Sequence, residues 1–537
     1  MTPVVNEETL VETIAGGKAL EHSASRLAGA ARVENWLLRH THLFSIVFVL
    51  TGFLIRIAVA RNAPLNGDEA LNFQLANQPR LLDVYSASLT NAHPPLFFFL
   101  LRFWLLLGNS ELFLRFLPAI FGTVFLWVFY RWASGLFGGL AGFIALILLS
   151  FSPSLVTLSA QVRGYTLLLL LIAATLLVLE KAIYGRSAGW MAISAALLCL
   201  AMLTHYSAFF VVLALFVYAP IRLRNGRSPA RLVKAWVGSQ FAVIGILVFL
   251  GVTHVAGLRG GALEHEVISR MLRTEYFQID QDRALQFLTR QTAAVFRALC
   301  GSSARGLVAA VLAAAGVTFL LRKREPSALL ILLPFLLNAG AALIDVYPYG
   351  GARQSAYLLV FASTAVGSAL AVLASGRRWA QVLAVGILAT STVAMAVSDL
   401  PGRDAVRMPA AFDSLRIAAP PGSLLFVDDR AFIVLDYYLG RNSWSTRRPG
   451  LQRFWESSVG GYRVIGSWIW NFTGHQLGAE LQRLAEVYRL PSHQVVWLIN
   501  VESEIDPVPE VSRRFPEATF PVLRRFGDTS LIKVVLP

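Results

Sequence analysis

The stretch LFSIVFVLTGFLIRIAVARNAPLNGDEALNF, residues 43–73, joins a long apolar run to an adjacent pair of carboxylates. The apolar part, residues 43–60, is long enough to cross a lipid bilayer as a helix. Asp68 and Glu69 follow within a few residues, where such a helix would leave the membrane. Ionisable groups at that level are costly unless they face a cavity or a cation, so the pair is a candidate functional site.

The composition indicates a polytopic membrane protein. Of the 537 residues, 56% are hydrophobic and only 15% are charged, and the mean hydropathy is +0.59. Apolar runs separated by short basic loops favour helices over a β-barrel. The net charge of +15 gathers in those loops, as the positive-inside rule expects, so we predict no nucleic-acid partner. Cys199 and Cys300 lie in or beside apolar runs, which supports neither a disulfide scaffold nor a thiol metal site.

About eleven membrane-spanning helices are expected, since each needs about 20 apolar residues. The predicted spans are 43–60, 112–131, 136–153, 164–184, 188–204, 206–222, 234–254, 293–320, 327–345, 355–374 and 378–397. Residues 1–40 are polar and have no apolar core, so they are expected to form a cytoplasmic lead rather than a signal peptide. Together, residues 41–400 form the predicted transmembrane domain.

Loop charge decides the orientation of these helices. The run PPLFFFLLRFWLLLG, residues 94–108, offers about 13 helical residues, or about 20 Å against a hydrocarbon core of about 30 Å. If it lies along the outer surface, every later cluster of Lys and Arg falls in the cytoplasm. Residues 61–111 then form one outer loop with interfacial helices, and residues 255–292 form a second. The chain is therefore predicted to cross the membrane many times, with a cytoplasmic N-terminus.

The last part of the chain has a different composition. After about residue 400, short apolar runs such as HQVVWLIN and DTSLIKVVLP alternate with polar segments. This alternation predicts a small α/β domain over residues 401–537. Eleven spans from a cytoplasmic start place that domain outside, which in a bacterial setting means the periplasm.

With this topology, unusual polar residues gather on the outer face, among them Asp68 and several arginines. Guanidinium groups suit phosphate oxygens, and a carboxylate beside them stays ionised and can accept a proton from an attacking hydroxyl. Asp68 is the candidate base; Glu69 points about 100° away on a helix, so it orients a partner or ligates a metal. Structural alternatives remain: Asp68 as a helix N-cap, Arg115 extending to the interface, and His205 as a satisfied structural residue.

The order of four motifs resembles that of a known family. NGDEALN, HPPLFFFLLRFWLLLGNSELFLRFLPAIFG, FSPSLVTLSAQVRGY and YPYGGARQSAYLL resemble segments of bacterial membrane glycosyltransferases of the GT-C class. The relevant family includes protein O-mannosyltransferases, aminoarabinose transferases acting on lipid A and galacturonosyltransferases of the lipopolysaccharide core. The resemblance covers roughly residues 40–400. One departure is that many relatives have Gln-Glu-Ala-Arg where this chain has QVRGY, so a carboxylate beside Arg163 is missing.

The resemblance implies a GT-C fold and a polyprenyl-phosphate-linked sugar donor. Asp68 matches the essential acidic position, Arg163 and Arg353 match the residues that hold the donor phosphate, and His93 and Arg115 match pocket positions. The expected catalytic residues are Asp68 and Glu69, and the expected substrate-binding residues are His93, Arg115, Arg163, Tyr165, His205, Tyr347, Arg353 and Gln354. A divalent metal at Glu69 is the one cofactor considered.

The predicted function is that of an inverting glycosyltransferase with a hydroxyl acceptor on lipid A or other lipopolysaccharide, a surface glycan or a protein. Membrane lipids are expected partners. The alternative is a transporter or flippase of a lipid-linked or anionic substrate, which is disfavoured by mostly unbroken spans and by the lack of an internal repeat. A third possibility is a non-catalytic scaffold. The sequence leaves the sugar and the acceptor open.

Overall fold

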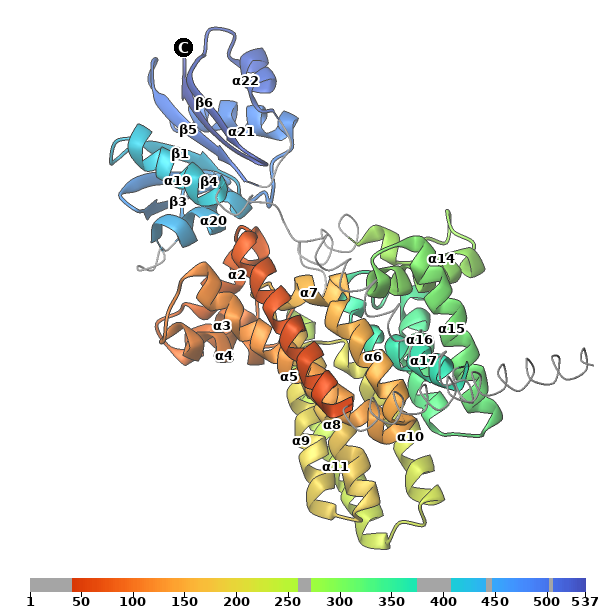
Figure 1. Ribbon diagram of the computed structural model, residues 1–537. Helices are drawn as coiled ribbons and strands as arrows, with labels where there is room; N and C mark the ends of the chain where they lie inside the picture. Colours follow the sequence, from red (N-terminus) through yellow and green to blue (C-terminus); the bar gives the residue numbers. More distant parts are fainter. Residues whose placement is uncertain (1–40, 259–271, 374–406, 441–446, 502–505) are drawn as a thin grey trace, which may run out of the picture.

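The computed structural model describes residues 41–258, 272–373, 407–440, 447–501 and 506–537 (Figure 1). A helical domain occupies residues up to 373, and a smaller domain with a mixed sheet lies at one end of it. Within the described residues, six helices are long and apolar enough to cross a membrane: Thr41–Asn62, α5 (Glu111–Phe137), α8 (Tyr165–Tyr184), α10 (Ala208–Asn225), Ala230–Val255, which contains α11 (Ala230–Leu250), and α15 (Ser303–Arg322).

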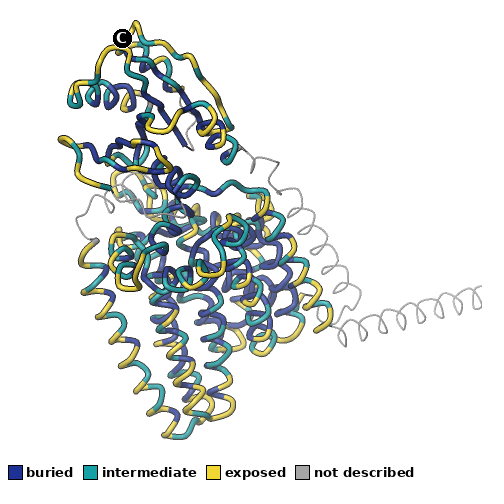
Figure 2. The backbone as a smooth tube through the Cα atoms, turned by 90° about the vertical axis from the view of Figure 1, so that its left-hand side faces the viewer, coloured by how far each residue is buried: buried dark blue, intermediate teal, exposed yellow. Residues whose placement is uncertain are grey.

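Further apolar helices complete the bundle. Shorter ones are α9 (Ala188–Met202), α16 (Ser327–Leu343) and α17 (Leu358–Leu373), and α6 (Gly139–Phe151) is bent by 61° against α7 (Pro153–Ser159). The exterior of the bundle is apolar, with Phe241 73% exposed and Val252 71% exposed. Figure 2 shows such exposed residues along the helices far from the sheet domain. Lipid contact explains this exposure. The predicted span 378–397 lies outside the described residues.

Three predicted spans correspond to the shorter helices α9, α16 and α17, with 15, 17 and 16 residues, and two others differ in their boundaries. The span expected over 293–320 is divided into α14 (Ala284–Cys300) and α15, because Gly301 adopts φ +74° and Ser302 caps the next helix. A glycine in the left-handed region is a common helix terminator. The second outer loop, predicted over 255–292, therefore includes the first turns of α14. The span expected over 136–153 continues past a bend at Pro153 into α7.

A buried arginine that the sequence analysis did not identify donates hydrogen bonds to the bend between α6 and α7. Arg56, fully buried in the first span, donates to the carbonyls of Ser150 at 2.9 Å and Leu149 at 3.4 Å. Its Nε also donates to the Ser159 hydroxyl at 3.0 Å. These carbonyls precede Pro153, which cannot donate a helical hydrogen bond. Arg56 thus replaces the donors that the proline bend removes.

The loop after the first span folds into three short helices: α2 (Gly67–Ala76), α3 (Leu81–Ser88) and α4 (Leu96–Leu105). With ten residues, α4 is too short to span, consistent with the interfacial helix expected there. Asn66 begins α2 through a capping box: its side chain accepts from Glu69 N–H, and its own N–H donates to the Glu69 carboxylate. The reading of Asp68 as the N-cap is therefore wrong.

The C-terminal domain is the small α/β unit expected from the sequence. Its seven strands lie in the order β2-β3-β4-β1-β5-β7-β6, with β1 parallel to β4 and β5 and the outer pairs antiparallel. The strands are β1 (Leu424–Val427), β2 (Arg448–Pro449), β3 (Phe454–Val459), β4 (Tyr462–Ser467), β5 (Val495–Asn500), β6 (Thr519–Phe526) and β7 (Thr529–Val535). The helices are α19 (Arg407–Ala418), α20 (Asp429–Gly440), α21 (Gly474–Val487) and α22 (Val508–Arg514).

Helix α20 joins the two domains by packing on α2 (Figure 1). The rings of Phe73 and Tyr437 meet edge to face with centroids 5.0 Å apart. Gln74 donates to Asp436 at 3.3 Å, and the Tyr437 hydroxyl donates to the carbonyl of Asn109 at 3.1 Å. The first turn of α20 also lies close to the acidic pair of α2, because the side chain of Arg430 lies against Gly67.

Candidate active site

The site is centred on Asp68 in the first turn of α2. Its Oδ2 atom accepts a hydrogen bond from Nη1 of Arg353 at 3.0 Å and forms an ion pair with Nη2 of Arg163. Arg163 lies in the turn between α7 and α8, and Arg353 lies in the 3-10 turn Arg353–Ser355 before α17. The structure therefore brings together three of the predicted site residues, which are separated by up to 285 positions.

Two hydrogen bonds place α2 against the turn that holds Arg163. The side-chain amide of Asn72 donates to the carbonyl of Val162 at 2.7 Å. The N–H of Val162 donates to Glu69 at 2.9 Å. Because both atoms of Val162 are bonded to α2, the neighbouring Arg163 is held beside Asp68.

The loop before Arg353 is also held in place. Gly350 has φ +140°, and a Cβ there would collide with side-chain oxygens of Gln291 and Glu275, so both the conformation and the space require glycine. Asn338 of α16 donates to the carbonyl of Pro348 at 2.9 Å, and Ser355 donates to the same carbonyl at 3.0 Å. The YPYGGARQ motif thus forms a rigid support for Arg353.

Asp68 is ionised in this environment. Burial would raise its pKa, but the guanidinium groups of Arg163 and then Arg353 outweigh burial and hold the pKa of Asp68 below its ordinary value. The side chain of Asp68 keeps 33% of its surface exposed, whereas that of Arg163 keeps only 5%. Nε of Arg163 is buried without a hydrogen-bond partner among the described residues. An unsatisfied buried donor beside a partly exposed carboxylate suits an anionic ligand.

Glu69 faces the opposite way and is fully paired. Its two oxygens accept from Nε and Nη2 of Arg115 at 2.8 and 2.7 Å, and each side chain is 1% exposed. Arg115 also donates to the carbonyls of Ala60, Ala63 and Pro64, at the end of the first span. The reading of Arg115 as a residue extending to the interface is therefore wrong, because its guanidinium points into the protein.

The pairing with Arg115 distinguishes between the two predicted roles of Glu69, that of an orienting residue and that of a metal ligand. Its oxygens also accept from the N–H groups of Asn66 and Val162, so little capacity is left for a metal. Among the described residues, no group of three or more His, Cys, Asp or Glu is arranged to hold a metal ion. The geometry favours Glu69 as an orienting group over a metal ligand.

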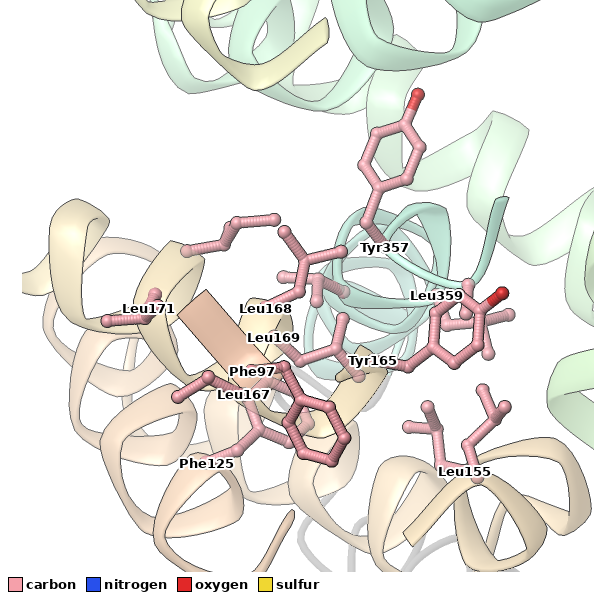
Figure 3. Packing of buried hydrophobic residues seen from close by; sticks show 14 of the residues in the cluster. Phe97, Phe125, Leu155, Tyr165, Leu167, Leu168, Leu169, Leu171, Tyr357 and Leu359 are labelled. Carbon is pink, nitrogen blue, oxygen red and sulfur yellow. The ribbon is translucent and has the colours of Figure 1, made fainter. Parts of the chain in front are cut away.

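His93, Tyr165 and His205 form an aromatic group behind Arg163. Ring centroids are 5.1 Å apart for the two histidines, 5.9 Å for His93 and Tyr165, and 5.0 Å for Tyr165 and His205. They line a void of about 10 Å³, near the minimum for one water. Figure 3 shows Tyr165 among buried residues of α7, α8 and α17, with Phe97 of α4 alongside.

Both histidines are neutral. Burial, followed by the charges of nearby groups including Arg163 and Arg353, holds the pKa of His93 well below its ordinary value and that of His205 at about 3. Nδ1 of His205 lies 2.8 Å from the Ser207 hydroxyl. This contact agrees with a structural role for His205.

Tyr347 and Gln354 lie in the same loop as Arg353. The Tyr347 ring packs on Phe210 at 5.2 Å, and its hydroxyl lies 3.5 Å from the carbonyl of Gln354. Burial, reinforced by neighbouring tyrosines, raises the pKa of Tyr347 well above its ordinary value, so the phenol stays protonated. These two residues support the loop.

A cavity of about 350 Å³ opens beside Arg353. It is bounded by α7, the end of α14 and the loop that carries Arg353, and its polar lining includes Ser154, Thr157, Gln161 and Ser355. Its size suits the head group of a ligand rather than a single ion.

The sequence analysis did not identify one further cation near Asp68. This is Arg430, at the start of α20 in the C-terminal domain. Nothing in the sequence pattern links residue 430 to residue 68.

Comparisons with known proteins identify the class of this fold. The family model described as dolichyl-phosphate-mannose-protein mannosyltransferase matches residues 92–252. The crystal structure of ArnT from Cupriavidus metallidurans bound to undecaprenyl phosphate aligns with a TM-score of 0.53 and 12% identity, covering 91% of this chain and 98% of that one. The same protein in the apo state aligns at 0.54 and 13%, covering 91% and 97%. No curated protein sequence matches the chain significantly.

The chain therefore has the fold of the GT-C class of membrane glycosyltransferases, as the sequence resemblance predicted. Within that class, it is similar over nearly its whole length to ArnT, including the small C-terminal domain.

Proposed function

We propose that this protein is a membrane glycosyltransferase that moves a sugar from a polyprenyl-phosphate-linked donor to a hydroxyl acceptor, with inversion at the anomeric carbon. The observation that carries the proposal is the ionised carboxylate of Asp68 held between Arg163 and Arg353, beside a cavity of about 350 Å³. The family model and the fold of ArnT, which was crystallised with undecaprenyl phosphate, support a lipid-linked donor.

The ion pairs suggest how donor binding prepares the base. Arg163 and Arg353 both contact the same oxygen of Asp68. A phosphate that binds these guanidinium groups competes with Asp68 for them. Once the contacts weaken, the pKa of Asp68 rises from its lowered value, which makes the carboxylate a better proton acceptor. Asp68 is thus activated only when the donor is in place.

The proposed reaction is a single displacement. The acceptor hydroxyl oxygen attacks the anomeric carbon, and the bond from that carbon to the phosphate oxygen breaks with its electron pair remaining on the phosphate. The hydroxyl proton passes to Asp68, and the arginines stabilise the charge that develops on the leaving phosphate. Attack opposite to the leaving group accounts for inversion. Glu69 and Arg115 position α2, and His93, Tyr165 and His205 form the uncharged wall behind Arg163.

The orientation follows from α8. This helix starts beside Arg163 and runs for 20 residues, about 30 Å, so the basic turn with Lys181 and Arg186 lies at the opposite end of the bundle. The positive-inside rule assigns that end to the cytoplasm. We therefore propose that the site and the C-terminal domain face the periplasm, with the protein in a bacterial inner membrane.

Transfer assays on the full chain in lipid nanodiscs test the proposal. The wild type is expected to release polyprenyl phosphate from a set of polyprenyl-phosphate sugars when envelope glycolipids or proteins are added. Asp68→Asn is expected to abolish transfer while the protein remains folded, and Asp83→Asn, an exposed aspartate of the same outer loop, is the matched control. Full transfer by Asp68→Asn would remove the base assignment. Mass spectrometry of envelope glycolipids from a strain lacking the protein identifies the acceptor.

Within the part of the chain that the structure describes, the bend between α6 and α7 favours a transporter, since transporters often place broken helices at their binding sites. The carbonyls at this bend, however, are bonded to Arg56 rather than open to a ligand. Uptake or flipping of a labelled lipid-linked sugar by proteoliposomes, without transfer, would support the transporter alternative.

A further inference from the structure

The C-terminal domain reaches the candidate active site through Arg430. A Cβ built on Gly67 would lie 2.8 Å from Nε and 2.9 Å from Cγ of Arg430. The arginine side chain therefore lies directly over Gly67, the residue that precedes Asp68. Gly67 makes room for this crossing, because any larger residue would displace the arginine.

The backbone of Arg430 is firmly held. Its N–H donates to the carbonyl of Trp470 at 3.0 Å. Asp428, two residues before Arg430, accepts from the N–H groups of Ala431 at 2.7 Å and Phe472 at 3.0 Å, which anchors the start of α20. Since α20 also packs on α2, the position of Arg430 over Gly67 is set by the docking of the two domains.

The charged groups around Arg430 also indicate that its side chain lies near Asp68. Burial lowers its pKa, and among the carboxylates that oppose this effect Asp68 comes first, ahead of Asp428 and Asp528. The oxygens of Asp428 are engaged by backbone N–H groups, and Asp528 is an exposed residue between β6 and β7. Asp68 is therefore the carboxylate of the membrane domain that Arg430 faces.

We propose that Arg430 is a third cationic residue of the site, supplied by the C-terminal domain, which stabilises the charge that develops on the leaving phosphate. This inference rests on the proposed glycosyl transfer. Arg163 and Arg353 together exceed Asp68 by one positive charge, which matches the single negative charge of a sugar phosphodiester. When the bond to the anomeric carbon breaks, the phosphate gains a second negative charge. Until the hydroxyl proton has passed to Asp68, Arg163 and Arg353 do not balance that charge, and Arg430 provides the additional cation.

A residue that acts on charge formed only during the reaction affects turnover more than binding. Arg430→Gln is therefore expected to lower kcat by about 100-fold, the usual order for removing one such donor, with less than about a threefold change in the donor KM. Arg430→Lys keeps the charge and is expected to recover part of the loss. The matched control is Arg513→Gln, because Arg513 is a 67% exposed arginine of the same domain, paired with Glu510.

Gly67→Ala provides a second variant that leaves every charge in place. Its new methyl group meets the side chain of Arg430 and is expected to lower kcat in the same direction as Arg430→Gln but by less. Melting temperatures of all variants are measured on the same full-length preparations. A lower kcat of folded enzyme can then be distinguished from a loss of folded protein.

The outcomes separate this inference from the proposed function. If Arg430→Gln and Arg513→Gln turn over equally while Asp68→Asn is inactive, the role of Arg430 is overturned and the proposed function stands. If Arg430→Gln changes KM alone, or if lysine restores nothing in a protein that melts like the wild type, the inference is also overturned. If Asp68→Asn is fully active, the proposed function itself fails.

Discussion

Glu69 and Asp68 are neighbours in sequence, yet substitution of Glu69 is expected mainly to reduce stability, whereas substitution of Asp68 is expected mainly to abolish activity. Glu69→Ala leaves the guanidinium of Arg115 buried without its carboxylate, and both side chains of the pair are 1% exposed. Breaking a buried pair in this way costs about 3–5 kcal/mol. The N–H of Val162 also loses its acceptor, which costs roughly 1–3 kcal/mol more. We expect a total loss of stability on the order of 5 kcal/mol.

Thermal unfolding of the full chain in detergent measures this effect. A loss of that size is expected to lower the apparent melting temperature of Glu69→Ala by about 10 °C or more. Asp68→Asn is expected to be inactive and to melt well above Glu69→Ala, because Asp68 is one-third exposed and the amide oxygen can still accept from Arg353, although Arg163 is only 5% exposed. The exposed pair of Arg80 and Asp83 provides the control, because removing it with Asp83→Asn costs less than about 1 kcal/mol.

A double variant distinguishes an unpaired charge from a simple loss of packing. Glu69→Leu and Arg115→Leu are each expected to destabilise the protein strongly, whereas the combination leaves no buried charge and is expected to melt above both single variants. Additive effects of the two substitutions, or wild-type melting of Glu69→Ala, would refute this account of the pair.

Three further outcomes are expected. Arg353→Gln removes a cation that lowers the pKa of Asp68, so the acidic limb of the pH profile of kcat/KM moves to higher pH. Burial raises the pKa of Asp428 to about 7, so its stabilising contribution is complete below about pH 4 and is lost as the pH rises to about 7. Asparagine removes the buried charge but keeps only one of the two acceptor oxygens, so Asp428→Asn is expected to lower the melting temperature near pH 4 and to have a more favourable effect near pH 8 than near pH 4. Arg56→Leu leaves carbonyls at the α6–α7 bend without donors, so the folded yield measured by size-exclusion chromatography is expected to fall.

Much of the architecture follows from patterns that act locally. Long apolar runs predicted helices long enough to span, and the brevity of the run after Pro94 and Pro95 predicted a helix too short to span, as the ten residues of α4 are. Loop charge then placed residues 68, 163 and 353 at the same end of the bundle, and the structure brings them into contact. These inferences succeed because hydrophobic length and topology constrain depth in the membrane, and residues at equal depth have a limited area in which to meet.

Features that depend on lateral packing were not predictable. The division between α14 and α15 rests on one glycine inside an apolar stretch, where composition alone indicates a continuous helix. The contact between Arg430 and Gly67 depends on how two domains dock, and neither position has a local signature of that contact. The hydropathy pattern predicts the depth of a residue in the membrane. The lateral position of a helix depends on side-chain packing between elements, which the pattern along the sequence does not show.

The capping of α2 explains how one dipeptide contributes to both the fold and the site. Asn66 starts the helix, so Asp68 and Glu69 are helical neighbours that point about 100° apart. Glu69 turns inward and bonds Arg115 together with the N–H of Val162, the residue next to Arg163. The distance between Asp68 and its ion-pair partner Arg163 is thus set through Glu69. Glu69 is therefore a positioning residue: its replacement should disturb the chemistry through the geometry of Asp68 even in the fraction of protein that still folds.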